Sequence, residues 1–305
     1  MTTTNGSWSG SPTSYSYQWQ DCDASGNNCT VIAGATLGSY VLTSGDVGDT
    51  IRAVVTASNA GGSGSASSAQ SAVVTTAVSI VQPVGDPLGR AWTEVFDDEF
   101  NGTSIDKSRW VALNGWGNNN VTSNAKNCSE SGGNLILALP GDGTGCDLYS
   151  SQKDGAGANA HDLLVGDYLE ARIWFPGPGS SPTSTVDNWP AFWAYDGSGN
   201  WLAGENDIAE ALGHMEFNYH STGQNSTASP PGNWGNSWHV YGIYRSATQV
   251  QVFYDGVVVE TLATSDNGGP ESIMFTSGET DACCGAPAVY GPAGNVLVDW
   301  VREWN

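Results

Sequence analysis

Gly204-Glu205-Asn206-Asp207-Ile208-Ala209-Glu210 places three carboxylates within six residues, in a 305-residue chain of which only 13% is charged. Two local structures suit this stretch. The residues have fair helix propensity, but Gly204 and Gly213 would limit a helix to about eight residues, which is a marginal length. A β-strand is the alternative, and it makes a sharper prediction about where the three acids point.

In a strand, Glu205 and Asp207 share one face because side chains alternate with a period of two, and Glu210 would point away. One extra residue, accommodated as a β-bulge at Ile208-Ala209, returns Glu210 to the face of the other two acids. Bulges of this kind occur next to active sites because they re-aim a side chain. The stretch therefore predicts a bulged strand with three acids on one face.

Three ionised carboxylates on one face repel one another, so the pKa of at least one must rise. Hydrolysis of a glycosidic bond requires such a set: one ionised nucleophile, one protonated acid and a neighbour that tunes them. An acidic strand that simply faces solvent is the alternative. Aromatic residues surround the cluster, in Asn188-Trp189-Pro190-Ala191-Phe192-Trp193-Ala194-Tyr195 and at Trp201 before it and in Phe217-Asn218-Tyr219-His220 after it. Acids among indoles favour carbohydrate chemistry.

The composition indicates an all-β protein, because 40 glycines and heavy Ser, Thr, Asn and Val usage favour strands and turns. Nine basic and 31 acidic residues give a formal net charge of −22. That charge repels nucleic acid and anionic membranes, and both are excluded as partners. No apolar run approaches the roughly 18 residues of a membrane helix. Met1-Thr2-Thr3-Thr4 does not begin a signal peptide, and we expect a trimmed form of a secreted, monomeric protein.

The six cysteines allow fifteen pairings. Spacing favours a disulfide between Cys22 and Cys29 across a hairpin, and another between Cys128 and Cys146 on either side of the strand 135–139. The adjacent Cys283 and Cys284 would pair with each other or elsewhere. Their spacings do not fit metal binding. An even number of cysteines in an acidic, turn-rich chain indicates an oxidising, extracellular setting.

Two domains are expected along the chain. Residues 1–78 are nearly free of charge and alternate in short segments such as Ser14–Gln20, Ser39–Leu42 and Thr50–Asn59, which predicts a small β-sandwich. Through the segments Tyr17–Cys22, Leu42–Gly48 and Ile51–Asn59, this part resembles the immunoglobulin-like modules of bacterial secreted enzymes, with one or two first strands truncated. Residues 79–90 carry two prolines and two glycines and read as a linker. Residues 91–305 begin and end in strands, which favours a jelly-roll β-sandwich.

The segment 91–305 resembles glycoside hydrolase family 16. The resemblance starts from Glu205-x-Asp207-x-x-Glu210, with Trp189-Pro190-Ala191-Phe192-Trp193 before it and His220 after it. Matching segments follow in the family's order along the domain: Asp98–Gly102, Asn114–Asn118, Gly133–Leu135, Glu170–Ile173, Trp238–Tyr241, Tyr254–Gly256 and Val298–Arg302. The six-residue, bulged form of the motif resembles the laminarinase, agarase and carrageenase branches of the family.

The resemblance implies a jelly roll with a cleft across one sheet, Glu205 as nucleophile, Glu210 as general acid/base, and Asp207 as the residue that holds the protonation state of the nucleophile. It places His220 beside the acid/base. Sugar-binding candidates are the indoles, whose faces stack on pyranose rings, together with this histidine: Trp116, Trp189, Trp193, Trp201 and His220. Asn206 departs from the family, which usually has Ile or Leu there, and a buried amide needs a hydrogen-bond partner.

The resemblance also implies a structural calcium ion held by Asp299 with main-chain oxygens near Glu99 and Gly133, since Ca²⁺ favours oxygen ligands. No cofactor is expected for catalysis. The expected activity is endo-acting, retaining hydrolysis of a β-glycan, with a β-1,3-glucan as the first substrate and a β-galactan such as agarose as the second. A glycan-binding protein without catalysis is the competing class, and an adhesion protein led by residues 1–78 is a third.

Overall fold

The computed structural model describes residues 1–40, 42–74, 82–86, 88–150, 157–196, 204–222, 224–279 and 288–305. The chain divides into two compact units, Met1–Ser79 and Ile80–Asn305. Both are built from strands, which confirms the all-β class. None of the helices in the described ranges reaches the length and apolarity needed to span a bilayer.

The first unit contains one antiparallel sheet in the order β2-β1-β3-β4. Its elements are β1 (Ser14–Cys22), β2 (Thr30–Val31), the short 3-10 helix η1 (Ser44–Asp46), β3 (Thr50–Asn59) and β4 (Gly62–Ser67). Trp19, Ile51 and Ala53 alternate inward and form its core with Ile32, Ala35, Tyr40 and Val74. Cys22 and Cys29 form the expected disulfide.

The expected two-sheet sandwich does not appear in the described part of this unit. Segment 39–42, expected as a strand, contributes only an isolated bridge between Ser39 and Thr2, and Val41 lies outside the described residues. Loop side chains, rather than a second sheet, cover the apolar face of β1 and β3, while β4 is exposed along its whole length. The immunoglobulin-like architecture is therefore not confirmed.

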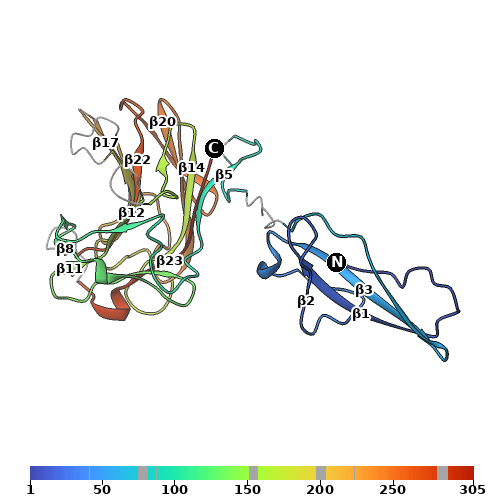
Figure 1. Ribbon diagram of the computed structural model, residues 1–305. Coiled ribbons are helices and arrows are strands. Elements are labelled where there is room, and N and C mark those ends of the chain that lie inside the picture. The colour runs from blue at the N-terminus through green and yellow to red at the C-terminus, as the bar shows by residue number, and fades with distance from the viewer. Residues whose placement is uncertain are drawn as a thin grey trace. The chain divides into compact units, whose positions relative to one another are not determined.

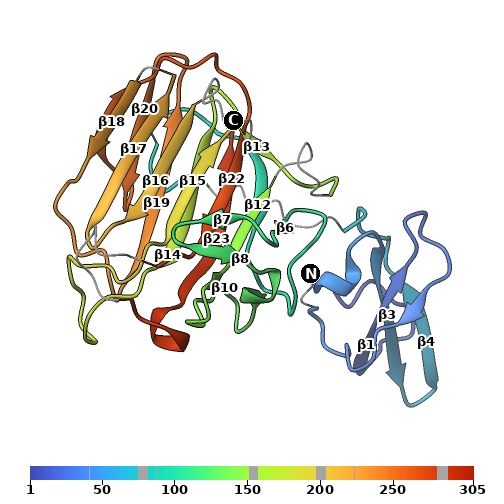
Figure 2. The same cartoon turned by 90° about the vertical axis from the view of Figure 1, so that its left-hand side faces the viewer.

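The second unit is a jelly-roll sandwich of two eight-stranded sheets, as the sequence predicted (Figure 1). The sheet that carries the acidic stretch is called the front sheet, and its strands lie side by side across the face seen in Figure 2. Its order is β18 (Gln224–Ala228), β17 (Met215–Ser221), β16 (Glu205–Ala211), β15 (Ala191–Tyr195), β22 (Glu271–Thr276), β12 (Asp147–Ser150) and β6 (Val111–Ala112), with β13 (Asp162–Leu163) also paired to β22.

The opposite sheet, called the back sheet, is antiparallel throughout. Its order is β21 (Val257–Ala263), β20 (Gln249–Tyr254), β19 (Trp238–Arg245), β14 (Tyr168–Trp174), β23 (Val296–Trp304), β10 (Leu135–Leu137) and β9 (Cys128–Glu130), with β5 (Glu94–Asp98) also paired to β23. A hairpin turn at Asp255-Gly256 joins β20 to β21. Both turn residues have positive φ, 48° and 77°, which a tight two-residue hairpin turn requires.

The core lies between the two sheets because inward-facing apolar residues alternate along each strand. Phe192 and Ala194 on β15 point inward with Phe217 and Tyr219 on β17, and they pack in the same cluster as Ala171 of β14 and other residues of the back sheet. The outward-facing residues of the front sheet are thereby left free to form a surface site.

Smaller elements complete this unit. A three-stranded sheet consists of β7 (Gly117–Asn118), β8 (Val121–Ser123) and β11 (Thr144–Gly145), and the 3-10 helices are η2 (Ala125–Asn127) and η3 (Gly291–Gly294). Cys128 and Cys146 form the second expected disulfide. Cys283 and Cys284 lie outside the described residues.

The segment 79–90, expected as a linker, is described in part, and that part lies against the second unit. The backbone N–H of Val84 donates to the buried carboxylate of Glu170 on β14, and the indole N–H of Trp92 donates to Asp86. Residues 82–86 therefore contribute hydrogen bonds to the sandwich.

Candidate active site

A β-bulge in β16 brings the three acids of Glu205–Glu210 to one face. Phe192 of β15 pairs with Ala209 and Trp193 pairs with Asp207, so Ile208 has no partner of its own. On the other side, two residues of β16, Ile208 and Ala209, face a single residue of β17. The predicted bulge is confirmed at its predicted place, and the helical alternative is wrong.

His220 forms an ion pair with Asp207, with 3.3 Å between Nε2 and the nearer carboxylate oxygen. The sequence placed this histidine beside Glu210, and that placement is wrong, because strand register sets His220 directly opposite Glu205. The hydrogen bond to Asp207 raises the pKa of His220 to about 9. Asn225 of β18 contacts the other ring nitrogen at 3.0 Å and orients the ring.

Glu210 is held by two hydrogen-bond donors. The indole N–H of Trp189 donates to one carboxylate oxygen at 2.7 Å, and the amide of Asn218 donates to the other at 2.7 Å. Burial, followed by the negative charge of Asp207, raises the pKa of Glu210 to about 7, and the two donors oppose that rise.

Burial also raises the pKa of Glu205, to about 8, with Asp207 as the next cause and His220 opposing it. The pKa of the fully enclosed Asp207 carboxyl is raised as well, again by burial first. The cluster therefore keeps protons at neutral pH. The two donors favour the anion on Glu210 rather than on Glu205, so the local electrostatics alone do not assign the nucleophile to Glu205.

Aromatic side chains form the floor beside the acids. Trp193 faces outward next to Asp207, and Trp116 stacks on it with ring centroids 6.4 Å apart and planes 17° apart. Tyr195 also packs against Trp193, with ring centroids 5.0 Å apart. The buried indole nitrogen of Trp193 has no hydrogen-bond partner among the described residues. Trp189 and His220 also join the site through the contacts above, whereas Trp201 lies outside the described residues.

Sequence reasoning missed Asn218, Asn225, Tyr195 and Tyr149. Asn218 has the same strand parity as His220, so alternation along β17 could have identified it as a neighbour of the acids. Tyr195 has the parity of Trp193 on β15 and was open to the same argument. Tyr149 reaches this aromatic floor from β12, through pairing with Met274 that no local pattern reveals.

Within the described part of the chain, one group of three residues brings its ligand atoms within 4.8 Å of one another and could hold a metal ion: Glu205, Asp207 and His220. His220 is already paired with Asp207. The raised pKa of His220 favours the protonated ring, which cannot bind a metal. We therefore interpret the group as an ion-paired acid cluster.

The residues expected to hold calcium do not fit a cation. The Asp299 carboxylate is paired with Arg172 at 2.5 Å, and the Glu99 carboxylate is paired with Arg302 at 2.6 Å. Gly133 follows β9 in a turn with positive φ. The Arg172 guanidinium already neutralises Asp299, the one side chain expected to bind calcium, and Arg302 places a second positive charge beside Glu99.

Comparison with solved structures supports the fold of the second unit. The catalytic domain of an endo-1,3-beta-glucanase (laminarinase) from Thermotoga petrophila RKU-1 matches with TM-score 0.54, 18% identity, and coverage of 70% of this chain and 98% of that chain. The endo-beta-1,3-glucanase from Pyrococcus furiosus matches with TM-score 0.52, 20% identity, and coverage of 70% and 94%. A glycosyl hydrolase family protein 16 from Mycobacterium smegmatis matches with TM-score 0.53, 22% identity, and coverage of 70% and 100%. No family model and no curated protein matches the sequence.

Proposed function

We propose that this protein is a secreted, endo-acting glycoside hydrolase that cleaves β-1,3-glucan with retention of anomeric configuration. The observation that carries the proposal is the bulge at Ile208, which turns Glu205, Asp207 and Glu210 to one face beside Trp189 and Trp193. Paired carboxylates with raised pKa values next to aromatic rings suit glycosidic bond cleavage. Similarity in fold to endo-1,3-beta-glucanases adds support.

The reaction proceeds in two displacements. Ionised Glu205 attacks the anomeric carbon while Glu210 donates its proton to the departing glycosidic oxygen, which gives a covalent glycosyl-enzyme and a shortened chain. Glu210, now ionised, takes a proton from water as the water oxygen attacks the same carbon. The bond to Glu205 breaks, and both carboxyl groups return to their first states.

The pair of Asp207 and His220 prepares Glu205 for this role. His220 keeps its proton well above neutral pH because Asp207 accepts its hydrogen bond. The imidazolium faces Glu205 across the strand pair and offsets part of the repulsion from the neighbouring acids. This positive charge lowers the pKa of Glu205 relative to a cluster without it, while burial and Asp207 still hold that pKa at about 8.

The substrate class is a long neutral glycan. Trp116, Trp193 and Tyr195 give an apolar floor for sugar rings, and the net charge of −22 disfavours sulfated polymers. β-1,3-Glucan leads because the two similar structures from Thermotoga petrophila and Pyrococcus furiosus are endo-1,3-beta-glucanases. A β-galactan remains the second substrate.

The organisation of the chain completes the proposal. Residues 1–78 form an accessory module of immunoglobulin-like type, residues 79–90 connect it, and residues 91–305 carry catalysis. The two disulfides suit an extracellular monomer. A structural calcium at Asp299, Glu99 and Gly133 stays a prediction that the arginine pairings disfavour.

The test is a reducing-sugar assay of the whole chain on laminarin, lichenan, agarose and carrageenan, before and after dialysis against EDTA. We expect turnover of laminarin, unchanged by EDTA, and the β-anomer as the first product in ¹H NMR. Binding to a glycan without any product would favour the non-catalytic glycan-binding protein. Turnover of agarose alone would move the substrate to the galactans.

Replacing Trp189 with Phe should move the basic limb of the kcat/KM profile to higher pH by about one unit. The indole N–H donates a hydrogen bond that stabilises the anion of Glu210. A hydrogen bond to a charged group contributes about 1.5–3 kcal/mol, and a shift of one pKa unit corresponds to about 1.4 kcal/mol. Without it the pKa of Glu210 rises, and the acid form persists to higher pH. Trp116→Phe, which changes an indole that contacts no carboxylate, is the control and should leave the limb in place. A basic limb that stays or moves down in Trp189→Phe contradicts the assignment of Glu210 as the acid.

A further inference from the structure

A buried polar chain lies directly behind the acid cluster, between the two sheets. Asn206 points inward, opposite Glu205 and Asp207, and its amide donates to the Glu271 carboxylate at 2.7 Å. Ala194 lies between them, paired with Asn206 on one side and with Ile273 on the other, and its small side chain leaves room for the two polar groups to meet. The partner that the sequence required for Asn206 is thus Glu271.

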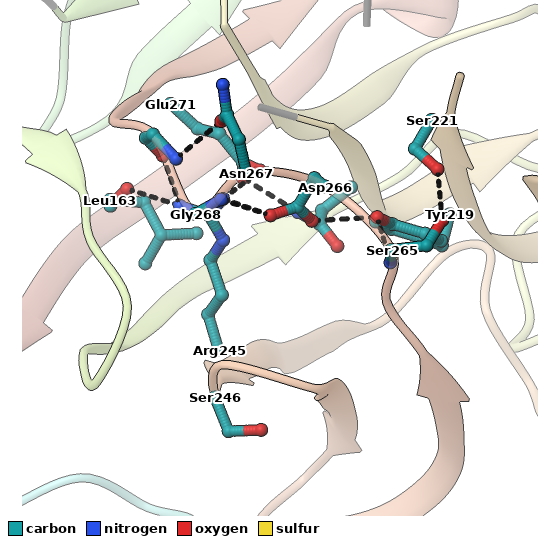
Figure 3. Close-up of polar contacts among 12 residues, drawn as sticks. Leu163, Tyr219, Ser221, Arg245, Ser246, Ser265, Asp266, Asn267, Gly268 and Glu271 are labelled. Carbon is teal, nitrogen blue, oxygen red and sulfur yellow. Dashed lines mark hydrogen bonds and ion pairs between the residues drawn. The ribbon is translucent and has the colours of Figure 1, made fainter. Parts of the chain in front are cut away.

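Arg245 joins Glu271 to the back sheet. It is the last residue of β19, it is almost fully buried, and its guanidinium lies 2.9 Å from Glu271 and 3.4 Å from Asp266 (Figure 3). The carbonyl groups of Leu163 and Gly269 also accept hydrogen bonds from this guanidinium, at 3.2 and 2.7 Å. A buried arginine with this many partners has one conformation, so it holds both carboxylates in place.

Tyr219 connects the buried polar residues to β16 and β17, the two strands of the site. This residue is the cross-strand partner of Asn206, and its hydroxyl donates to Asp266 at 2.7 Å (Figure 3). Gly204, the residue before Glu205, runs close against the chain with φ of +97°. A Cβ there would lie 3.0 Å from Asp266 and 3.3 Å from Glu271. The backbone immediately before Glu205 therefore packs directly against the carboxylates of Asp266 and Glu271.

We propose that the buried chain of Asn206, Glu271, Arg245 and Asp266 is a positioning device for Glu205, which fixes the strand behind it and controls the negative charge that it faces. This inference rests on the proposed function for its kinetic part only. Asn206 and Glu271 are positioning residues, because they act on the reacting group through the strand and its electrostatic field.

In addition to burial, the negative charge of Glu271 raises the pKa of Glu205. Burial raises the pKa of Glu271 to about 8, against the opposing effects of Arg245 and Asn206, while Asp266 and Asp196 add to the rise. The charged groups that face Glu205 are Asp207, His220, Glu210 and Glu271 itself. Because the negative charge of Glu271 raises the pKa of Glu205, ionisation of one disfavours ionisation of the other.

Glu271→Gln tests the charge. The substitution keeps the shape, leaves Arg245 paired with Asp266, and removes the ionisable group. We expect the acidic limb of kcat/KM to move to lower pH by about half a unit, since a like charge that opposed ionisation of Glu205 is gone. Glu303→Gln is the matched control, because Glu303 is also fully buried with a pKa of about 8 but lies on β23 of the back sheet, where His161 contacts it. It should leave the profile unchanged.

Asn206→Leu tests the positioning and covers the case in which Glu271→Gln does not fold. We expect kcat per folded molecule to fall about tenfold with KM within about twofold, since Glu205 shifts while the sugar-binding face is intact. A purely structural role would lower the melting temperature and leave kcat and the profile as in the wild type, and that result would overturn the inference. If wild type hydrolyses no glycan, the proposed function fails by itself. A ¹³C NMR titration of the Glu205 carboxyl in wild type and Glu271→Gln then decides the inference, with equal pKa values overturning it.

Discussion

Glu205→Gln should abolish hydrolysis of laminarin, with kcat lower by at least about 10⁴-fold, because the covalent route through this carboxylate is lost. The fold should remain and become more stable above pH 8, since an uncharged amide replaces a buried carboxyl whose pKa is raised to about 8. Reducing-sugar release and thermal unfolding followed by circular dichroism measure the two effects. Glu260→Gln on β21 of the back sheet is the control and should match the wild type in both.

Azide separates the roles of the two glutamates, which the pKa values of about 8 and about 7 leave open. On an aryl β-glucoside with a good leaving group, Glu205→Gly plus azide should give the α-glycosyl azide, because the anion attacks from the side vacated by the nucleophile. Glu210→Ala plus azide should give the β-glycosyl azide, formed from the glycosyl-enzyme. The reverse pattern would exchange the two roles. Activity near wild type in Glu205→Gln would reject the hydrolase mechanism itself.

The sandwich should lose stability as pH rises from 5 to 8.5, by about 10 °C in the melting temperature. Burial raises the pKa of Glu205, Glu271 and Glu303 to about 8, and that of Glu170 and Glu210 to about 7. An acid whose pKa is raised by folding holds its proton more tightly in the native state, so native protein binds more protons than unfolded protein between pH 4.5 and 8. The stabilisation that each such acid contributes is complete below about pH 4.5 and is lost as the pH rises through 7 to 8.

Together these acids change the free energy of unfolding by about 3–5 kcal/mol over this pH range, after allowance for their coupling. Each kcal/mol of unfolding free energy corresponds to about 2–4 °C in the melting temperature of a unit of this size. Acids with a lowered pKa, such as Asp106, lose their contribution only below about pH 4, outside this range. Differential scanning calorimetry at 0.5 M NaCl measures the effect with general charge repulsion screened. Glu303→Gln should flatten the dependence. A melting temperature that rises from pH 5 to 8.5 contradicts the raised pKa values.

Much of the site was predictable because it depends on the parity of one strand. Glu205 and Asp207 share a face in any strand, and the need to bring Glu210 to that face located the bulge within one residue of its position. The same reasoning applied to β17 and β15 would have added Asn218 and Tyr195. His220 was placed beside the wrong acid because register between strands depends on the length and course of the connecting turn, and parity contains no such information.

From the amino-acid sequence alone one could predict the all-β class, the jelly-roll sandwich of the second unit, the two disulfides and the bulged acidic strand. These depend on local alternation, turn residues and spacing, which are written along the chain. The contact between Asn206 and Glu271, and those of Arg245 with Glu271 and Asp266, became visible only in the folded molecule. The folded molecule also shows that Arg172 occupies the carboxylate of Asp299, the side chain expected to hold calcium. Those contacts join residues on different strands and sheets, and the packing of two sheets, rather than any local pattern, selects which polar groups share the interior.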